Sequence, residues 1–248
     1  MKHLLLIITV LFAGNAIAVS KGYPLDKANI DPNDSESLRR GATLFANYCF
    51  NCHSVSLMRY SRIGNDLAYD EAQLESLLVF TGAKIGDLME NAMQKEDAKR
   101  WFGVVPPDLS VVSRSRGVDW LYTYLRSFYH DPSRPWGVNN AVFNDVAMPH
   151  VLWELQGLQF PVFDIVKDHE GVEHQVIKEL IISQPGKLTA EQFDNAVRDI
   201  VNFLHYMGEP TKQKRLQTGI WVILYLAIFF VVMLFLKKEY WKDVKKSD

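Results

Sequence analysis

Cys49-Phe50-Asn51-Cys52-His53 is the stretch that decides how this chain folds. Two cysteines with two residues between them, followed at once by a histidine, form the attachment motif of a c-type haem. The two thiols can each form a thioether with one porphyrin, and the imidazole of His53 can then bind its iron. These are the only 2 cysteines in the chain. We therefore expect one covalently bound haem c on Cys49 and Cys52, with His53 as an iron ligand.

Two other uses of a CxxC pair fit the sequence less well. A dithiol redox site would be expected within a βαβ pattern, which the chain does not show. A zinc site usually needs four ligands, and no second Cys/His cluster has finger-like spacing.

The N-terminal end predicts export. Lys2 and His3 precede an apolar run over residues 4–13, and Ala16-Ile17-Ala18 has the small-x-small pattern of a cleavage site. Residues 1–18 are therefore predicted to be a secretory signal peptide. The apolar run is too short to span a bilayer, which disfavours a retained anchor.

The C-terminal end predicts a membrane anchor. Residues 219–236 (GIWVILYLAIFFVVMLFL) carry no charge, so we expect a transmembrane helix over 218–236. A core helix of a soluble domain would instead show a polar stripe. Five lysines follow the span, and this bias places the tail, 237–248, in the cytoplasm. The domain over 19–210 is then periplasmic, on a bacterial inner membrane.

Charge is unevenly distributed along the chain. Residues 19–210 contain 18 Lys and Arg against 26 Asp and Glu, whereas the C-terminal tail is basic. An acidic exported surface disfavours nucleic acid and suits a basic protein partner reached by electrostatic steering. A simple role in solubility would produce the same composition.

Two helices are expected to build the core around the haem motif. Apolar or small residues at spacings of three and four predict a helix from Asp34 or Ser35 to the first haem cysteine. Thr189 and Gln192 form a capping box that starts a second helix, which Gly208-Glu209-Pro210 ends. We expect this second helix to pack on the first through these residues: Ile200 and Phe203 against Gly41 and Phe45.

Between these helices the sequence predicts further elements. Helices are expected from residue 69, over 84–102 and over 119–129, with Met89 and Met93 in the core. The rigid Pro106-Pro107 pair leads into a short helix. Residues 130–147 form a long irregular loop, which in a compact domain is usually functional. A hairpin is expected over 160–182, with His169 and His174 on its surface.

An electron-carrying haem takes a sixth ligand, and a methionine raises its potential. The other methionines are disfavoured because they are initiating, membrane-embedded, helical or only five residues past His53. Met148 follows the long loop and is the candidate. His150 is the alternative and would lower the potential.

Several motifs resemble known haem proteins. Gly41, Phe45 and the CxxCH motif match the GxxxFxxxCxxCH pattern of cytochromes c, where the glycine lets the C-terminal helix cross closely. Arg59-Tyr60, the PPDLS segment at 106–110 and Ala147-Met148-Pro149 resemble the cytochrome c1 family. The resemblance covers almost the whole mature chain. One departure is that His150 follows Met148-Pro149 where a second proline is expected.

This resemblance implies a mainly α, class I cytochrome c-like haem domain with loop and hairpin insertions and one transmembrane helix. It implies that Pro107 lines the haem pocket, that Met148 binds the iron and that Arg116 pairs with a haem propionate. The alternative for Arg114 and Arg116 is two solvated surface charges.

The implied function is electron transfer in the quinol–cytochrome c oxidoreductase, the cytochrome bc1 complex. The haem would receive an electron from the Rieske iron–sulfur protein and pass it to a cytochrome c, with cytochrome b and the lipid bilayer as partners. The chain would be a redox subunit and no enzyme on its own. A tethered cytochrome feeding a terminal oxidase is one alternative, and a peroxidase-type haem enzyme with an open sixth position is the other.

Overall fold

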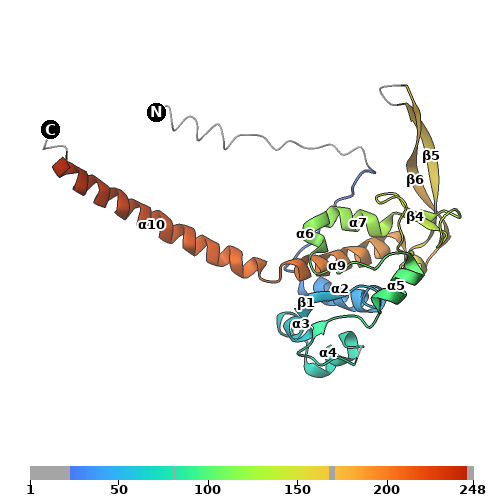
Figure 1. The fold of residues 1–248 in the computed structure, drawn as a ribbon, viewed down its shortest axis with the longest axis horizontal. Coiled ribbons are helices and arrows are strands. Elements are labelled where there is room, and N and C mark those ends of the chain that lie inside the picture. Colours follow the sequence, from blue (N-terminus) through green and yellow to red (C-terminus); the bar gives the residue numbers. More distant parts are fainter. Residues whose placement is uncertain (1–22, 81, 168–170, 245–248) are drawn as a thin grey trace.

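The computed structural model describes residues 23–80, 82–167 and 171–244 and shows a helical domain from which a hairpin and a long helix project (Figure 1). Its mainly α character agrees with the predicted fold class. The elements in chain order are α2 (Ser35–Tyr48), β1 (Val55–Arg59), α3 (Tyr60–Leu67), α4 (Glu71–Leu78), β2 (Leu88–Met89), α5 (Lys95–Phe102), α6 (Val112–Arg116), α7 (Val118–Arg126), β3 (Phe128–His130), β4 (Val138–Asn140), α8 (Trp153–Gln156), β5 (Gly157–Lys167), β6 (Glu173–Pro185), α9 (Ala190–Gly208) and α10 (Lys212–Val244).

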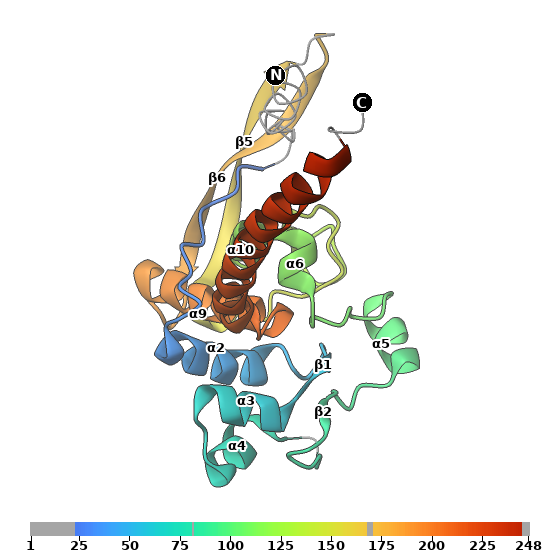
Figure 2. The ribbon, with the colours of Figure 1, turned by 90° about the vertical axis from the view of Figure 1, so that its left-hand side faces the viewer.

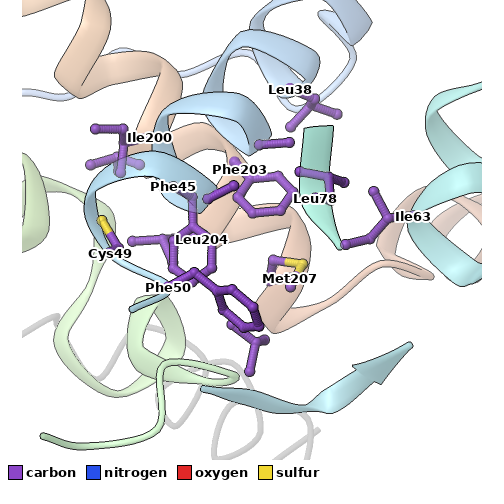
Figure 3. Close-up of a cluster of buried hydrophobic side chains, with 14 of the residues drawn as sticks. Leu38, Phe45, Cys49, Phe50, Ile63, Leu78, Ile200, Phe203, Leu204 and Met207 are labelled. Atoms are coloured by element: carbon purple, nitrogen blue, oxygen red, sulfur yellow. The ribbon is translucent and has the colours of Figure 1, made fainter. Parts of the chain in front are cut away.

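Helices α2 and α9 cross at Gly41 and form the centre of the core. A Cβ atom built on Gly41 would lie 2.1 Å from the backbone oxygen of Asp199, so only glycine permits this approach. The rings of Phe45 and Phe203, both fully buried, have their centroids 5.6 Å apart. Ile200 lies in the same buried cluster (Figure 3). The predicted pairing of the two helices is confirmed.

A buried ionic cluster fastens the same crossing. The Asp199 carboxylate is 10% exposed and accepts hydrogen bonds from Ser37 Oγ at 2.7 Å and from Arg40 Nε at 2.7 Å and Nη2 at 3.0 Å. Asn202 Nδ2 donates to Ser37 Oγ at 3.0 Å. A buried carboxylate is stable only when it is paired in this way, so the cluster fixes how the helices meet.

Both helices begin where the sequence predicts. Asp34 caps α2 by accepting a hydrogen bond from Ser37 N at 3.0 Å. Thr189 Oγ1 accepts from Gln192 N, and the Gln192 side chain accepts from Thr189 N, which completes the capping box of α9. Each cap satisfies backbone N–H groups that have no partner within the helix.

The predicted helix over 84–102 is wrong in its first half. Only Lys95–Phe102 is helical, whereas Leu88–Met89 forms β2 and pairs with β1, placing Met89 opposite Val55. The physical reason is a turn: Lys84 N donates to Asp87 Oδ2 at 2.8 Å, and Asp87 N donates back to the Lys84 carbonyl. Such local bonds compete with a helix. Met89 is fully buried as predicted, and Met93 is half-buried.

The hairpin is confirmed and is longer than predicted. Strands β5 and β6 pair antiparallel from Gly157 opposite Pro185 to Lys167 opposite Glu173, and they extend away from the helices (Figure 1). Gln159 Nε2 fixes the base by donating to the Phe128 carbonyl at 2.9 Å. His174 is exposed as predicted, whereas His169 lies outside the described residues.

Two further predictions are corrected or extended. Helix α7 ends at Arg126 rather than 129, because Phe128–His130 pairs with Val138–Asn140 as β3 and β4. The loop over 130–147 therefore contains one short strand. The predicted signal peptide, 1–18, lies outside the described residues.

Helix α10 leaves the domain as a single rod (Figure 1), which Figure 2 shows nearly end-on. Within the described residues, the segment Lys214–Lys242 is long and apolar enough to cross a bilayer, with a mean hydropathy of 2.8 and none of its apolar window buried. It contains the predicted span over 218–236. A helix that exposes its apolar side chains all round is suited to lipid.

Candidate haem-binding site

The CxxCH motif continues the last turn of α2. Cys49 N donates to the Phe45 carbonyl at 2.9 Å, and the Cys49 carbonyl accepts from Cys52 N at 3.1 Å and His53 N at 2.9 Å. These bonds wrap the motif into a turn and bring both thiols and the imidazole to the C-terminal end of one helix. Figure 3 shows Cys49 beside Ile200 and Leu204 of α9.

The surroundings of the thiols do not suit a reactive dithiol. Both cysteines are free, and burial raises the pKa of Cys49 to about 12 and also raises the pKa of Cys52. A reactive dithiol pair needs the opposite shift. Among the described residues no group of three or more His, Cys, Asp or Glu could hold a metal ion.

The tautomer of His53 is set by Pro107. His53 Nδ1 lies 2.7 Å from the Pro107 carbonyl oxygen, which can only accept, so Nδ1 carries the proton. The lone pair of Nε2 is thereby left for a metal. Burial lowers the pKa of His53, against the opposing effects of the Pro107 carbonyl and Asp108, which favours the neutral ring that an iron ligand requires.

The Pro107 carbonyl is held in place by its neighbours. Asp108 accepts hydrogen bonds from Ser56 N and Ser110 N, each at 2.8 Å, and Leu109 N donates to the Ser54 carbonyl at 2.9 Å. These hydrogen bonds join the PPDLS segment to β1 and to the residue before it. The family resemblance implies that Pro107 lines the pocket, but no pattern in the sequence indicates that its carbonyl orients the histidine.

Met148, the predicted second iron ligand, lies beside helix α7. Its half-buried Sδ accepts a hydrogen bond from the Tyr124 hydroxyl at 3.3 Å. Tyr124 belongs to α7, and its ring stacks on Trp120 with centroids 4.9 Å apart and an interplanar angle of 10°. The sulfur therefore lies beside an aromatic wall that consists of the stacked rings of Trp120 and Tyr124.

The loop before Met148 is ordered by two asparagines. The fully buried Asn140 donates from Nδ2 to the Tyr124 carbonyl at 2.8 Å, and its Oδ1 accepts from Val142 N and Phe143 N. Asn139 Oδ1 accepts from Asp145 N at 2.9 Å. These side chains replace the missing backbone ladder, so a loop that looks irregular in sequence has a defined shape.

His150, the alternative ligand, is packed into the core. It is 7% exposed and its ring stacks on Phe128 with centroids 4.9 Å apart and planes 1° from parallel. Burial lowers the pKa of His150 to about 4, against a smaller opposing effect of Gln156. Its Nε2 has no hydrogen-bond partner within the described part of the chain.

Arg116 is exposed but lies against the aromatic wall. Its guanidinium carbon is 5.1 Å from the centroid of the Trp120 ring and 5.8 Å from that of Phe143. Cation–π contacts of this kind position a charge that would otherwise be mobile. Arg114 is exposed as well.

The predicted residues therefore form two groups. The two thiols, His53 and Pro107 make one group, and Met148 and Arg116 meet through Trp120 and Tyr124 in the other. The donors fit a haem: two thiols at thioether spacing, a neutral imidazole with a free lone pair, and a thioether sulfur. No motif in the sequence singles out Tyr124 or Asn140 as residues that position Met148 and its loop. The i, i+4 spacing of Trp120 and Tyr124 does indicate that these two rings share one face of a helix.

Comparison with known proteins gives a family match and relatives that carry different names. A family model described as the Cytochrome C1 family matches residues 27–244. A cytochrome c1 of Allochromatium vinosum is 49% identical over 245 residues, which cover 98% of this chain and 100% of the relative. An ammonia monooxygenase gamma subunit of Nitrosomonas europaea is 48% identical and covers 89% of this chain and 88% of its own length. A cytochrome c1 of Rhodospirillum rubrum is 25% identical over 86% of this chain and 83% of its own.

Proposed function

The chain belongs to the cytochrome c1 family, whose members carry one covalently bound haem c as the electron-transfer subunit of a bc1 complex, and from this we propose its specific path. The haem domain accepts single electrons from a Rieske iron–sulfur protein and delivers them to a cytochrome c. Cytochrome b and the lipid bilayer surround its anchor. The domain over 19–210 lies on the periplasmic side of a bacterial inner membrane.

The observation that carries the proposal is the hydrogen bond of 2.7 Å between His53 Nδ1 and the Pro107 carbonyl. It leaves the lone pair of Nε2 available to bind iron, close in sequence to two thiols that are free to form thioethers. In this assignment Cys49 and Cys52 attach the cofactor, His53 and Met148 bind its iron, and Pro107 orients His53. When bound, the haem supplies a one-electron redox centre.

Arg116 is a further residue that we expect to act on this redox centre. Arg116, whose guanidinium lies over Trp120, would pair with a propionate through its forked guanidinium. Because the donor set contains both an imidazole and a thioether, His53 and Met148 would together hold the iron. This supports an electron carrier over a peroxidase-type enzyme, which needs one position open.

The ligand assignment is tested with Met148→Leu in the full-length, membrane-inserted protein. We expect loss of the far-red absorption band that a thioether–iron(III) bond produces, a fall in midpoint potential and retention of covalent haem. Met93→Leu, at a half-buried methionine elsewhere, is the matched control and should change none of these. A band that survives in Met148→Leu would exclude this residue as the ligand. A native protein that lacks the band, and whose midpoint potential changes in His150→Phe but not in Met148→Leu, would favour the histidine.

The partner assignment is tested by gentle extraction. We expect cytochrome b and a Rieske protein to copurify with the full-length chain in mild detergent. Copurification with a terminal oxidase alone would instead support the tethered-cytochrome alternative. Rapid binding of carbon monoxide by the native protein would contradict the carrier proposal, since it requires an open axial position.

A further inference from the structure

We propose that Tyr124 is a positioning residue for the iron ligand: its hydroxyl holds the Met148 sulfur in the binding orientation and raises the midpoint potential of the haem. This inference rests on the proposed role of Met148. It is carried by the hydrogen bond of 3.3 Å from the Tyr124 hydroxyl to Met148 Sδ.

The Tyr124 ring is held from two sides. Trp120 stacks on one face at 4.9 Å, and Phe128 meets it at an angle of 68° with centroids 5.2 Å apart. Phe128 is fully buried and is itself stacked on His150. A ring packed in this way cannot swing its hydroxyl away from the sulfur without moving the core.

The backbone of Tyr124 also fixes the loop that delivers Met148. Its carbonyl accepts from Asn140 Nδ2 at 2.8 Å, and Asn140 in turn orders the backbone of residues 142 and 143. One residue of α7 therefore contacts the methionine loop twice, once near its start and once at the sulfur. This double contact sets where Sδ lies relative to the rest of the site.

The chemistry follows from the direction of the hydrogen bond. A thioether sulfur has two lone pairs, so Met148 could accept a hydrogen bond on one and donate the other to iron. The positive end of the Tyr124 O–H dipole, directed at this sulfur, would then disfavour the more positively charged, oxidised iron. A phenol hydroxyl keeps its proton at neutral pH, so it remains a donor.

The test is Tyr124→Phe in the full-length protein, which removes the hydroxyl and keeps the ring. We expect the far-red sulfur–iron band to remain and the midpoint potential to fall. At a fixed ambient potential, the ratio of reduced to oxidised protein should drop by about two- to fivefold, the scale of one hydrogen bond. Tyr122→Phe is the matched control, because Tyr122 is a buried tyrosine of the same helix whose ring instead contacts Arg126.

A second substitution keeps the shape of the side chain entirely. A ring-fluorinated tyrosine at position 124 is a stronger donor, so the potential should move upward, opposite to Tyr124→Phe. A purely structural role for the ring would not produce shifts of opposite sign.

The outcomes separate this inference from the proposal beneath it. If Met148→Leu retains the sulfur–iron band, Met148 is not the ligand and both ideas fail. If Met148→Leu loses the band but Tyr124→Phe has the same potential as Tyr122→Phe, the role of Met148 stands and that of Tyr124 is overturned.

Discussion

At the scale of single residues, the candidate site depends on a backbone carbonyl and a carboxylate that keep His53 in position. The Pro107 carbonyl orients His53, and Asp108 holds that segment in place through Ser56 N and Ser110 N. Burial alone would raise the pKa of Asp108, but the hydrogen bonds from Ser110 and Ser56 outweigh it and lower the pKa below its ordinary value of 3.8. The ionised carboxylate is therefore the form that the folded protein favours.

This shift predicts an acid-dependent loss of stability. Because the folded state lowers the pKa of Asp108, the unfolded state binds more protons below the ordinary value, and stability is lost as the pH falls through the folded pKa. Asp108→Asn should lower stability near neutral pH and flatten the dependence in the acid range. Urea unfolding from neutral pH down to about pH 3 measures both effects. The exposed Glu75→Gln is the control, and an unchanged acid slope in Asp108→Asn would contradict the assignment.

At the scale of elements, the crossing of α2 and α9 depends on one missing side chain. A methyl group at Gly41 would overlap the Asp199 backbone and lie 2.8 Å from Phe203 Cβ, so the helices would have to separate. We expect Gly41→Ala to reduce the free energy of unfolding by about 3 kcal/mol.

The same substitution at Gly86 provides the comparison. No atom lies within 4 Å of a Cβ built there, so Gly86→Ala should be close to neutral. Denaturant unfolding of both variants with haem attached decides the point. Equal stabilities would show that the helices can shift without cost.

The elements that the sequence predicted are those specified by local signals. The capping box of Thr189 and Gln192 predicts the start of α9, and the cap at Asp34 with the apolar stripe after it predicts α2. Strand β2 is two residues long and exists because Met89 meets Val55, a contact that no local pattern encodes. The bond between His53 and Pro107 joins residues 54 positions apart, so the residue types were predictable and their geometry was not.

At the scale of the whole molecule, the anchor is separable from the domain. The apolar window of α10 buries none of its residues against the rest of the chain, and the junction is tied by Arg215 to Glu209 and by Lys212 to His205. Partly exposed polar contacts of this kind contribute little to stability.

We therefore expect a chain that ends at Thr211 to keep its haem and its fold in water. Its unfolding free energy should lie within about 1 kcal/mol of that of the full-length protein in detergent. Phase partitioning and denaturant unfolding are the measurements. Loss of the haem domain's stability on truncation would show that α10 contributes to the core.

The crossing of α2 and α9 also sets an order of events in time. It joins Ser37 to Asp199, 162 positions later in the chain. Synthesis produces the N-terminal segment first, and closing so long a loop is slow. In the finished domain Cys49 is 7% exposed and belongs to the same buried cluster as residues of α9. We therefore expect attachment of the cofactor to precede the docking of α9, because this docking buries the Cys49 thiol.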